Sequence, residues 1–131
     1  MILDSSALIA VLKEEPEAAE FIDLIDRAPH CRISAVNYVE SAAVVDSNRD
    51  PVFSRQFEDF LQQAEIQIQP VTTAQAHVAR QAYRDFGKGS GHPAKLNFGD
   101  CFAYALARDK AEPLLFKGDD FSHTDITSAL D

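Results

Sequence analysis

Acidic residues follow the two most apolar short segments of the chain, at its start and near its end. Asp4 comes directly after the apolar run 1–3, and Asp119 and Asp120 come shortly after the apolar run 113–116. Such runs are typical of strands buried on both faces of a parallel sheet, and ligand sites in open α/β sheets lie beyond the carboxyl ends of the strands. The sequence therefore predicts carboxylates at this rim. A helix N-cap at Asp4 and an ordinary acidic turn at 119–120 are the simpler alternatives.

Two further acids lie on the apolar faces of predicted helices. The neighbours of Glu40 at helical spacing are mostly apolar: Val36, Asn37, Ala43 and Val44. If Asn97 caps the later helix, Asp100 is its third residue and shares a face with Ala103, Tyr104 and Ala107. A buried, unpaired carboxylate is strongly unfavourable, so each of these acids needs a cation. The alternatives are an arginine partner or contact with water for Glu40, and a favourable first-turn acid for Asp100.

Together these acids predict a magnesium-type site. Clustered carboxylates repel one another unless a cation lies between them, and oxygen ligands without histidine or cysteine favour Mg²⁺ or Mn²⁺ over zinc. Such ions activate water and stabilise the leaving oxygen in phosphodiester hydrolysis. The four histidines lack metal spacing, and the chain contains no phosphate-binding glycine motif or G-x-S-x-G motif.

Apolar periodicity and caps predict an alternation of strands and helices. The expected strands are 1–3, 31–34, 66–71 and 113–116, with a short last strand around Ile126. The expected helices are 5–12, 17–27, 35–47, 53–64, 73–86 and 97–110, with a glycine-rich loop over 87–95. This order predicts a three-layer α/β/α sandwich with a central, mostly parallel sheet of four or five strands.

Composition indicates one soluble, intracellular domain over residues 1–131. Of these residues 46% are hydrophobic, but no window approaches the length of a membrane span. Cys31 and Cys101 show neither zinc nor disulfide spacing and suit a reducing compartment. The net charge of −9 argues against nucleic-acid binding through a broad basic surface, but it does not exclude an enzyme that reaches phosphate through bound cations.

Four segments carry a resemblance to PIN-domain proteins and, within that group, to the VapC toxins of bacterial toxin–antitoxin systems. They are MILDSSAL at 1–8, SAVNYVE at 34–40, LNFGDCFAYALA at 96–107 and LLFKGDDF at 114–121. The resemblance covers essentially the whole chain. One departure is that Phe116 and Gly118 stand where many PIN domains carry a hydroxyl and an acid.

The resemblance implies roles for the acids and for two polar residues. Asp4 and Asp100 match the principal metal ligands, Glu40 matches the second acid, and either Asp119 or Asp120 is the fourth. Two more positions match supporting groups: Ser6, a hydroxyl that supports the first acid, and Asn97, which orients Asp100 or caps its helix. The resemblance further implies a Mg²⁺-dependent endoribonuclease, with Mn²⁺ as a substitute, that uses a metal-activated water. It also implies a homodimer, a VapB-like antitoxin that blocks the site, and the bacterial cytoplasm.

An RNA substrate needs positive contacts on this acidic chain. The candidates are Arg80, Arg84, Lys88, Lys95 and Lys117. The first three recur every four residues and would form a stripe on a helix. A solvated helix face is the alternative interpretation.

Two other functions remain open from sequence. One is a PIN-like module that binds RNA or a partner without cutting. The other is a Mg²⁺-binding phosphoacceptor signalling domain, which would need an aspartate at the end of a middle strand. The predicted strand 66–71 is followed by no such residue.

Overall fold

Four short parallel strands form the central sheet, in the order β3-β2-β1-β4. The computed structural model describes all 131 residues. The strands are β1 (Ile2–Leu3), β2 (Cys31–Ser34), β3 (Ile66–Gln69) and β4 (Leu114–Leu115). In the register, Leu3 lies opposite Ile33 on one side and Leu115 on the other. The prediction of a parallel sheet with four or five strands is confirmed.

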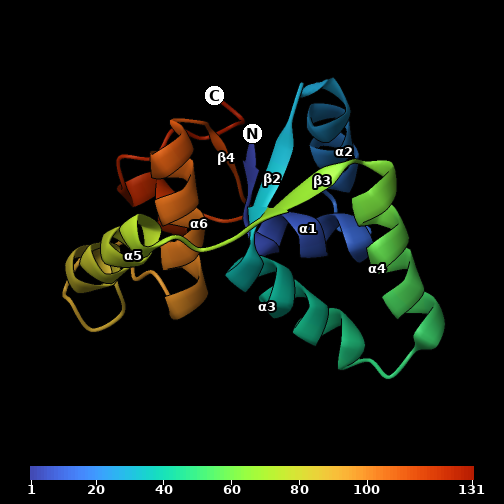
Figure 1. Cartoon of the computed structure of the whole chain (residues 1–131), viewed down its shortest axis with the longest axis horizontal. Helices are drawn as coiled ribbons and strands as arrows, with labels where there is room; N and C mark the ends of the chain where they lie inside the picture. The colour runs from blue at the N-terminus through green and yellow to red at the C-terminus, as the bar shows by residue number, and fades with distance from the viewer.

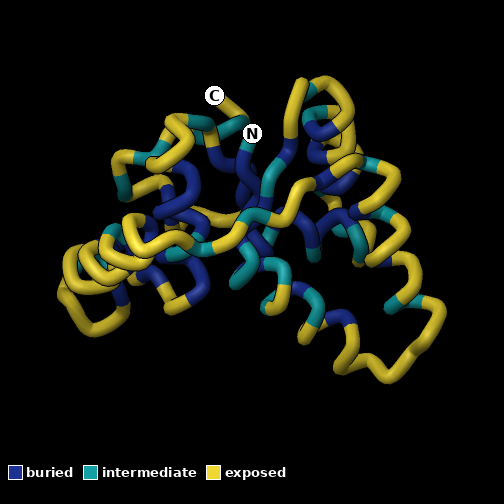
Figure 2. Tube along the Cα trace, in the orientation of Figure 1, coloured by how far each residue is buried: buried dark blue, intermediate teal, exposed yellow.

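Six helices cover the two faces of this sheet (Figure 1). They are α1 (Ser5–Leu12), α2 (Ala18–Arg27), α3 (Ala35–Asp46), α4 (Pro51–Gln63), α5 (Thr73–Phe86) and α6 (Phe98–Lys110), and a short 3₁₀ helix, η1 (Asp120–His123), follows β4. Because neighbouring strand residues point to opposite faces, Ile2 and Leu114 pack under α5 and α6, whereas Leu3 and Leu115 pack under α1, α2 and α4. The expected α/β/α sandwich is therefore present, with its buried residues gathered around the sheet in Figure 2.

Several element boundaries differ by a residue or two from those expected, and a proline lies at two of them. The helix expected over 53–64 begins at Pro51 and ends at Gln63, because Asp50 caps it and proline is well suited to the first helical turn. The strand expected over 66–71 stops at Gln69, since the next residue, Pro70, has no N–H to donate to a neighbouring strand.

The expected strand around Ile126 does not form. The nearby segment makes only an isolated bridge between Leu114 and Ser128. The backbone N–H of Leu114 donates to the carbonyl of Thr127, and the carbonyl of Leu114 accepts from the backbone N–H of Ala129. These bonds cover the outer edge of β4. The other edge strand, β3, pairs only with β2, so its outer edge is free.

No helix of the structure is both long enough and apolar enough to cross a membrane.

Candidate carboxylate site

The predicted acids meet at the carboxyl ends of β1 and β2. A pocket of about 390 Å³ at this rim is lined by side chains from both faces of the sheet, among them Asp4, Ser6, Glu40, Asn97, Asp100 and Lys117. Asp4 follows β1, Glu40 lies on α3, which follows β2 directly, and Asp100 lies in the first turn of α6. The convergence expected from the ends of the apolar runs is thus present for three acids.

Asp4 uses its two carboxylate oxygens differently. Its side chain is buried, with 3% of the residue exposed. Oδ2 accepts a hydrogen bond of 3.0 Å from the backbone N–H of Ser6 and so caps α1, while Oδ1 is buried with no hydrogen-bond partner. Asp4 can therefore cap α1 with one oxygen while its other oxygen has no partner in the protein. Burial raises the pKa of Asp4, hydrogen bonds from Ser6 offset part of that rise, and the nearby charge of Glu40 adds to it.

Asp100 is held by a reciprocal cap with Asn97. Its Oδ2 accepts from the backbone N–H of Asn97 at 3.0 Å, and the Asn97 Oδ1 accepts from the backbone N–H of Asp100 at 2.9 Å. Burial, followed by the charge of Asp4, raises the pKa of Asp100 to about 7. A carboxyl with this pKa is half protonated at neutral pH, and a nearby cation would restore its charge.

Glu40 is oriented by neutral donors. Its Oε1 accepts from Ser5 Oγ, and from Asn37 Nδ2 at 3.3 Å. None of the ion pairs in the structure includes Glu40, so the arginine partner considered from sequence is absent.

Neither Asp119 nor Asp120 lines this pocket. The charge of Asp120 contributes to the raised pKa of Asp100. Ser6 supports Asp4 through its backbone N–H, and its hydroxyl accepts the backbone N–H of Lys117 at 3.0 Å, which ties α1 to the segment after β4.

Sequence reasoning missed three residues that contact Glu40: Ser5, Asn37 and Gly99. Asn37 lies one helical turn before Glu40, and this spacing was the only available signal. The contacts of Ser5 and Gly99 join separate helices, and the sequence carries no local pattern for them.

The donor set fits a hard divalent cation. No three carboxylate, imidazole or thiol groups stand close enough together to ligate one ion as they lie, which is consistent with the mutual repulsion of uncompensated acids. The buried, unpartnered Oδ1 of Asp4 is the feature that a cation would satisfy. All donors are oxygens, as Mg²⁺ and Mn²⁺ require.

The predicted cationic residues divide into paired and free groups. Arg84 pairs with the adjacent Asp85, and Lys117 pairs with Glu15 and Glu17 at 3.3 and 3.4 Å. Three candidates make no ion pair: Arg80, Lys88 and Lys95. Both lysines line a hollow in the glycine-rich loop that contains no carboxylate.

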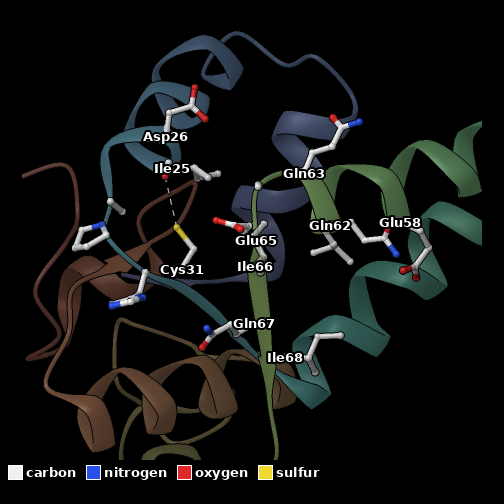
Figure 3. A pocket seen from close by; sticks show the side chains of 15 residues that line it. Ile25, Asp26, Cys31, Glu58, Gln62, Gln63, Glu65, Ile66, Gln67 and Ile68 are labelled. Carbon is white, nitrogen blue, oxygen red and sulfur yellow. Dashed lines mark hydrogen bonds between the residues drawn. The ribbon is translucent and has the colours of Figure 1, made fainter.

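A second hollow, of about 800 Å³, is separate from the carboxylate site. It lies at the amino ends of β2 and β3, between the carboxyl ends of α2 and α4 (Figure 3). Three acids line it, Asp26, Glu58 and Glu65, and no lysine or arginine does.

Comparison with known proteins identifies the family. A model of the PIN domain matches residues 1–126. Ribonuclease VapC28 of Mycobacterium tuberculosis is 54% identical over 131 residues, which are all of this chain and 98% of that protein. Ribonuclease VapC42 of the same species is 49% identical over 129 residues, covering 98% of each chain.

Two solved structures share the fold. VapC20 of M. tuberculosis, described as a toxin that cleaves the sarcin–ricin loop, superposes with a TM-score of 0.72 at 14% identity, covering 96% of this chain and 95% of that one. A chain of a toxin–antitoxin complex from Klebsiella pneumoniae gives 0.69 at 16% identity, covering 92% and 89%.

Replacement of Asp100 by Asn should stabilise the metal-free protein at alkaline pH. The pKa of Asp100 is raised in the folded state, so its ionisation opposes folding increasingly as the pH rises from about 4 through about 7. In EDTA at pH 8, Asp100→Asn should melt several degrees above the unmodified protein, and the difference should close below pH 4. Saturating Mn²⁺ should raise the melting temperature of the unmodified protein far more than that of the variant. A variant that melts lower at pH 8 in EDTA would contradict the assigned repulsion.

Proposed function

This chain belongs to the PIN-domain family and, within it, to the VapC ribonucleases, and we propose that it cleaves RNA at the site formed by Asp4, Glu40 and Asp100. VapC proteins are the toxins of toxin–antitoxin pairs, and this chain acts as such a toxin in the bacterial cytoplasm. The observation that carries the assignment of the site is the buried Oδ1 of Asp4, which has no partner and belongs to a residue that lines a pocket with three other acids, Glu15, Glu40 and Asp100.

Asp4 and Asp100 are the principal ligands of a Mg²⁺ ion, for which Mn²⁺ can substitute, and Glu40 and Asp120 complete the set. When bound, the ion supplies Lewis acidity that lowers the pKa of a water and stabilises the leaving oxygen of the phosphodiester. The chain supplies orientation. One oxygen each of Asp4 and Asp100 is fixed by a helix cap, which leaves the other oxygen of each residue uncommitted to that cap. No histidine lines the pocket, so no imidazole base takes part.

The free cations support RNA contact beside the acids. Lys88 and Lys95 lie in the loop that leads into α6, and Asp100 lies in the first turn of that helix. Arg84 and Lys117 are engaged by carboxylates and contribute less. Phosphate contacts from the loop would bring the backbone of an RNA strand toward the carboxylate site.

Cleavage should depend on Asp4 and on a divalent cation. Asp4→Asn removes a charge but keeps the side-chain oxygen that caps α1, so the variant should fold while losing at least about 100-fold in cleavage rate. The measurement is cleavage of total RNA by antitoxin-free protein with Mn²⁺ and with EDTA, followed by mapping of the cut ends.

The matched control is Asp59→Asn, which changes an exposed acid on α4. This variant should cleave at the rate of the unmodified protein. Cleavage that continues in EDTA, or an Asp4→Asn protein as active as the control, would remove the proposed chemistry.

We also propose that two copies associate through an apolar patch on α5 and α6. Three residues define this patch: Tyr83, Phe98 and Phe102. Phe98 is 69% exposed, and all three residues line a hollow of about 260 Å³ between α5 and α6 whose lining is mostly apolar. Exposed aromatic clusters of this kind are typical of protein interfaces.

Phe98→Asp should convert a dimer to a monomer, because the charged side chain cannot be buried in the patch without a partner. Light scattering after size-exclusion chromatography measures the mass. Val52→Asp is the control, since Val52 is comparably exposed but lies on α4 outside the patch. A dimer that survives Phe98→Asp, or dissociates equally in the control, excludes this interface.

The acid-lined hollow between α2 and α4 is our proposed contact for the antitoxin. VapC toxins pair with antitoxins, and a groove with three acids and no lysine or arginine suits a segment that presents basic side chains. Ile25, Leu61 and Ile66 in the same lining provide apolar contacts.

Charge reversal in this hollow should weaken the complex. The double variant Asp26→Lys and Glu65→Lys should bind the co-expressed cognate antitoxin at least about tenfold more weakly, with a smaller dependence on salt, measured by calorimetry. Glu20→Lys reverses an exposed acid of α2 that does not line the hollow and should leave the affinity unchanged. Equal affinities for both proteins would place the antitoxin elsewhere.

A further inference from the structure

Gly99 occupies a position where the carboxylate of Glu40 takes up the space of a side chain. A Cβ atom added at Gly99, the second residue of α6, would lie 2.6 Å from both Cδ and Oε1 of Glu40 and would also overlap Oε2. Side-chain carbons do not approach other atoms this closely. The carboxylate of Glu40, which comes from α3, therefore fills the space that any other residue at position 99 would need.

The backbone does not explain this glycine. Gly99 is helical, and its φ lies outside the left-handed region, unlike Gly89, Gly91 and Gly118. In a helix, glycine is less favourable than alanine. The first turn of α6 thus carries a residue that weakens the helix. What the absence of a side chain provides at this position is space for the carboxylate of Glu40.

Asn37 closes the other side of this space. It is fully buried, and its Nδ2 donates to the backbone carbonyl of Gly99 at 3.0 Å and to Glu40 Oε1 at 3.3 Å. Ser5 Oγ donates to the same oxygen of Glu40 and to the carbonyl of Asn37 at 3.2 Å. Oε1 is therefore held by two donors, while Oε2 accepts no hydrogen bond from the protein and lies against Gly99.

We infer that Gly99 is a positioning residue for the reaction, and that with Asn37 it forms a seat holding Glu40 within reach of the ion bound by Asp4 and Asp100. This inference rests on the proposed function. A glutamate side chain has three rotatable bonds, and two neighbouring carboxylates repel Glu40 toward water. The seat opposes that movement, because the carboxylate fits against a bare backbone and meets two fixed donors.

Gly99→Ala separates positioning from folding. The atoms displaced by the new Cβ are the end of a flexible, half-buried side chain, so the variant should melt in EDTA at or above the temperature of the unmodified protein. Its affinity for Mn²⁺ alone, followed by the paramagnetic resonance signal of the free ion, should fall at least about tenfold.

Ser41→Ala provides the opposite case. Ser41 is buried on α3, and its hydroxyl donates to the carbonyl of Asn37 at 2.8 Å and makes no hydrogen bond to the Glu40 carboxylate. This variant should melt at a lower temperature and bind Mn²⁺ with unchanged affinity. We therefore expect Gly99→Ala to lower the affinity for Mn²⁺ without lowering the stability, and Ser41→Ala to lower the stability without lowering the affinity.

A double-mutant cycle with Glu40→Ala decides whether Gly99 acts through Glu40. We expect Glu40→Ala to weaken Mn²⁺ binding, and Gly99→Ala to add nothing in that background. If Glu40→Ala leaves the affinity unchanged, the proposed role of Glu40 fails. If it weakens binding while Gly99→Ala does not, or if Gly99→Ala weakens binding equally in both backgrounds, the seat is overturned. Loss of the fold in Gly99→Ala would also overturn it, since the space would then serve helix packing.

Discussion

Repulsion between Asp4 and Asp100 is the constraint on which the rest of the site depends. Each is largely buried, and the charge of Asp4 contributes to raising the pKa of Asp100. Two such groups would normally separate or pair with cations, but β1 and α6 fix their backbones on either side of the rim. The acids are held in an arrangement that the polypeptide alone does not compensate. This uncompensated charge gives an acidic protein a strong local preference for a small cation.

Helix capping is the device that holds these acids in place. Asp4 caps α1 and Asp100 shares a reciprocal cap with Asn97, so in each case one oxygen is committed to a helix end and the other is not. A side chain fixed in this way loses little further freedom when it binds a ligand. The same residue that starts a helix also aims the functional atom, and stability and binding therefore share one set of hydrogen bonds.

The sequence predicted the parts of this site that depend on local pattern. Asp4, Glu40 and Asp100 could be found because an acid at the end of an apolar run, or on the apolar face of a helix, contradicts its surroundings. The loop after β4 has no periodicity to set its path, so the sequence could not choose between Asp119 and Asp120 as the fourth acid.

Contacts between elements distant in the sequence could not be predicted. Gly99 and Asn37 act across the α3–α6 packing, and neither contradicts its local pattern. Arg84 of the predicted basic stripe forms an ion pair with the next residue, Asp85, and its contact with RNA stays a prediction. The central sheet also joins segments that are distant in the sequence, because β1 at the start of the chain pairs with β4 near residue 115. Asp4 and Asp100 are separated by almost as many residues. During synthesis the ribosome must extend the chain beyond α6 before the two acids can meet. A chain that stops before α6 lacks Asp100 and therefore cannot assemble the carboxylate site.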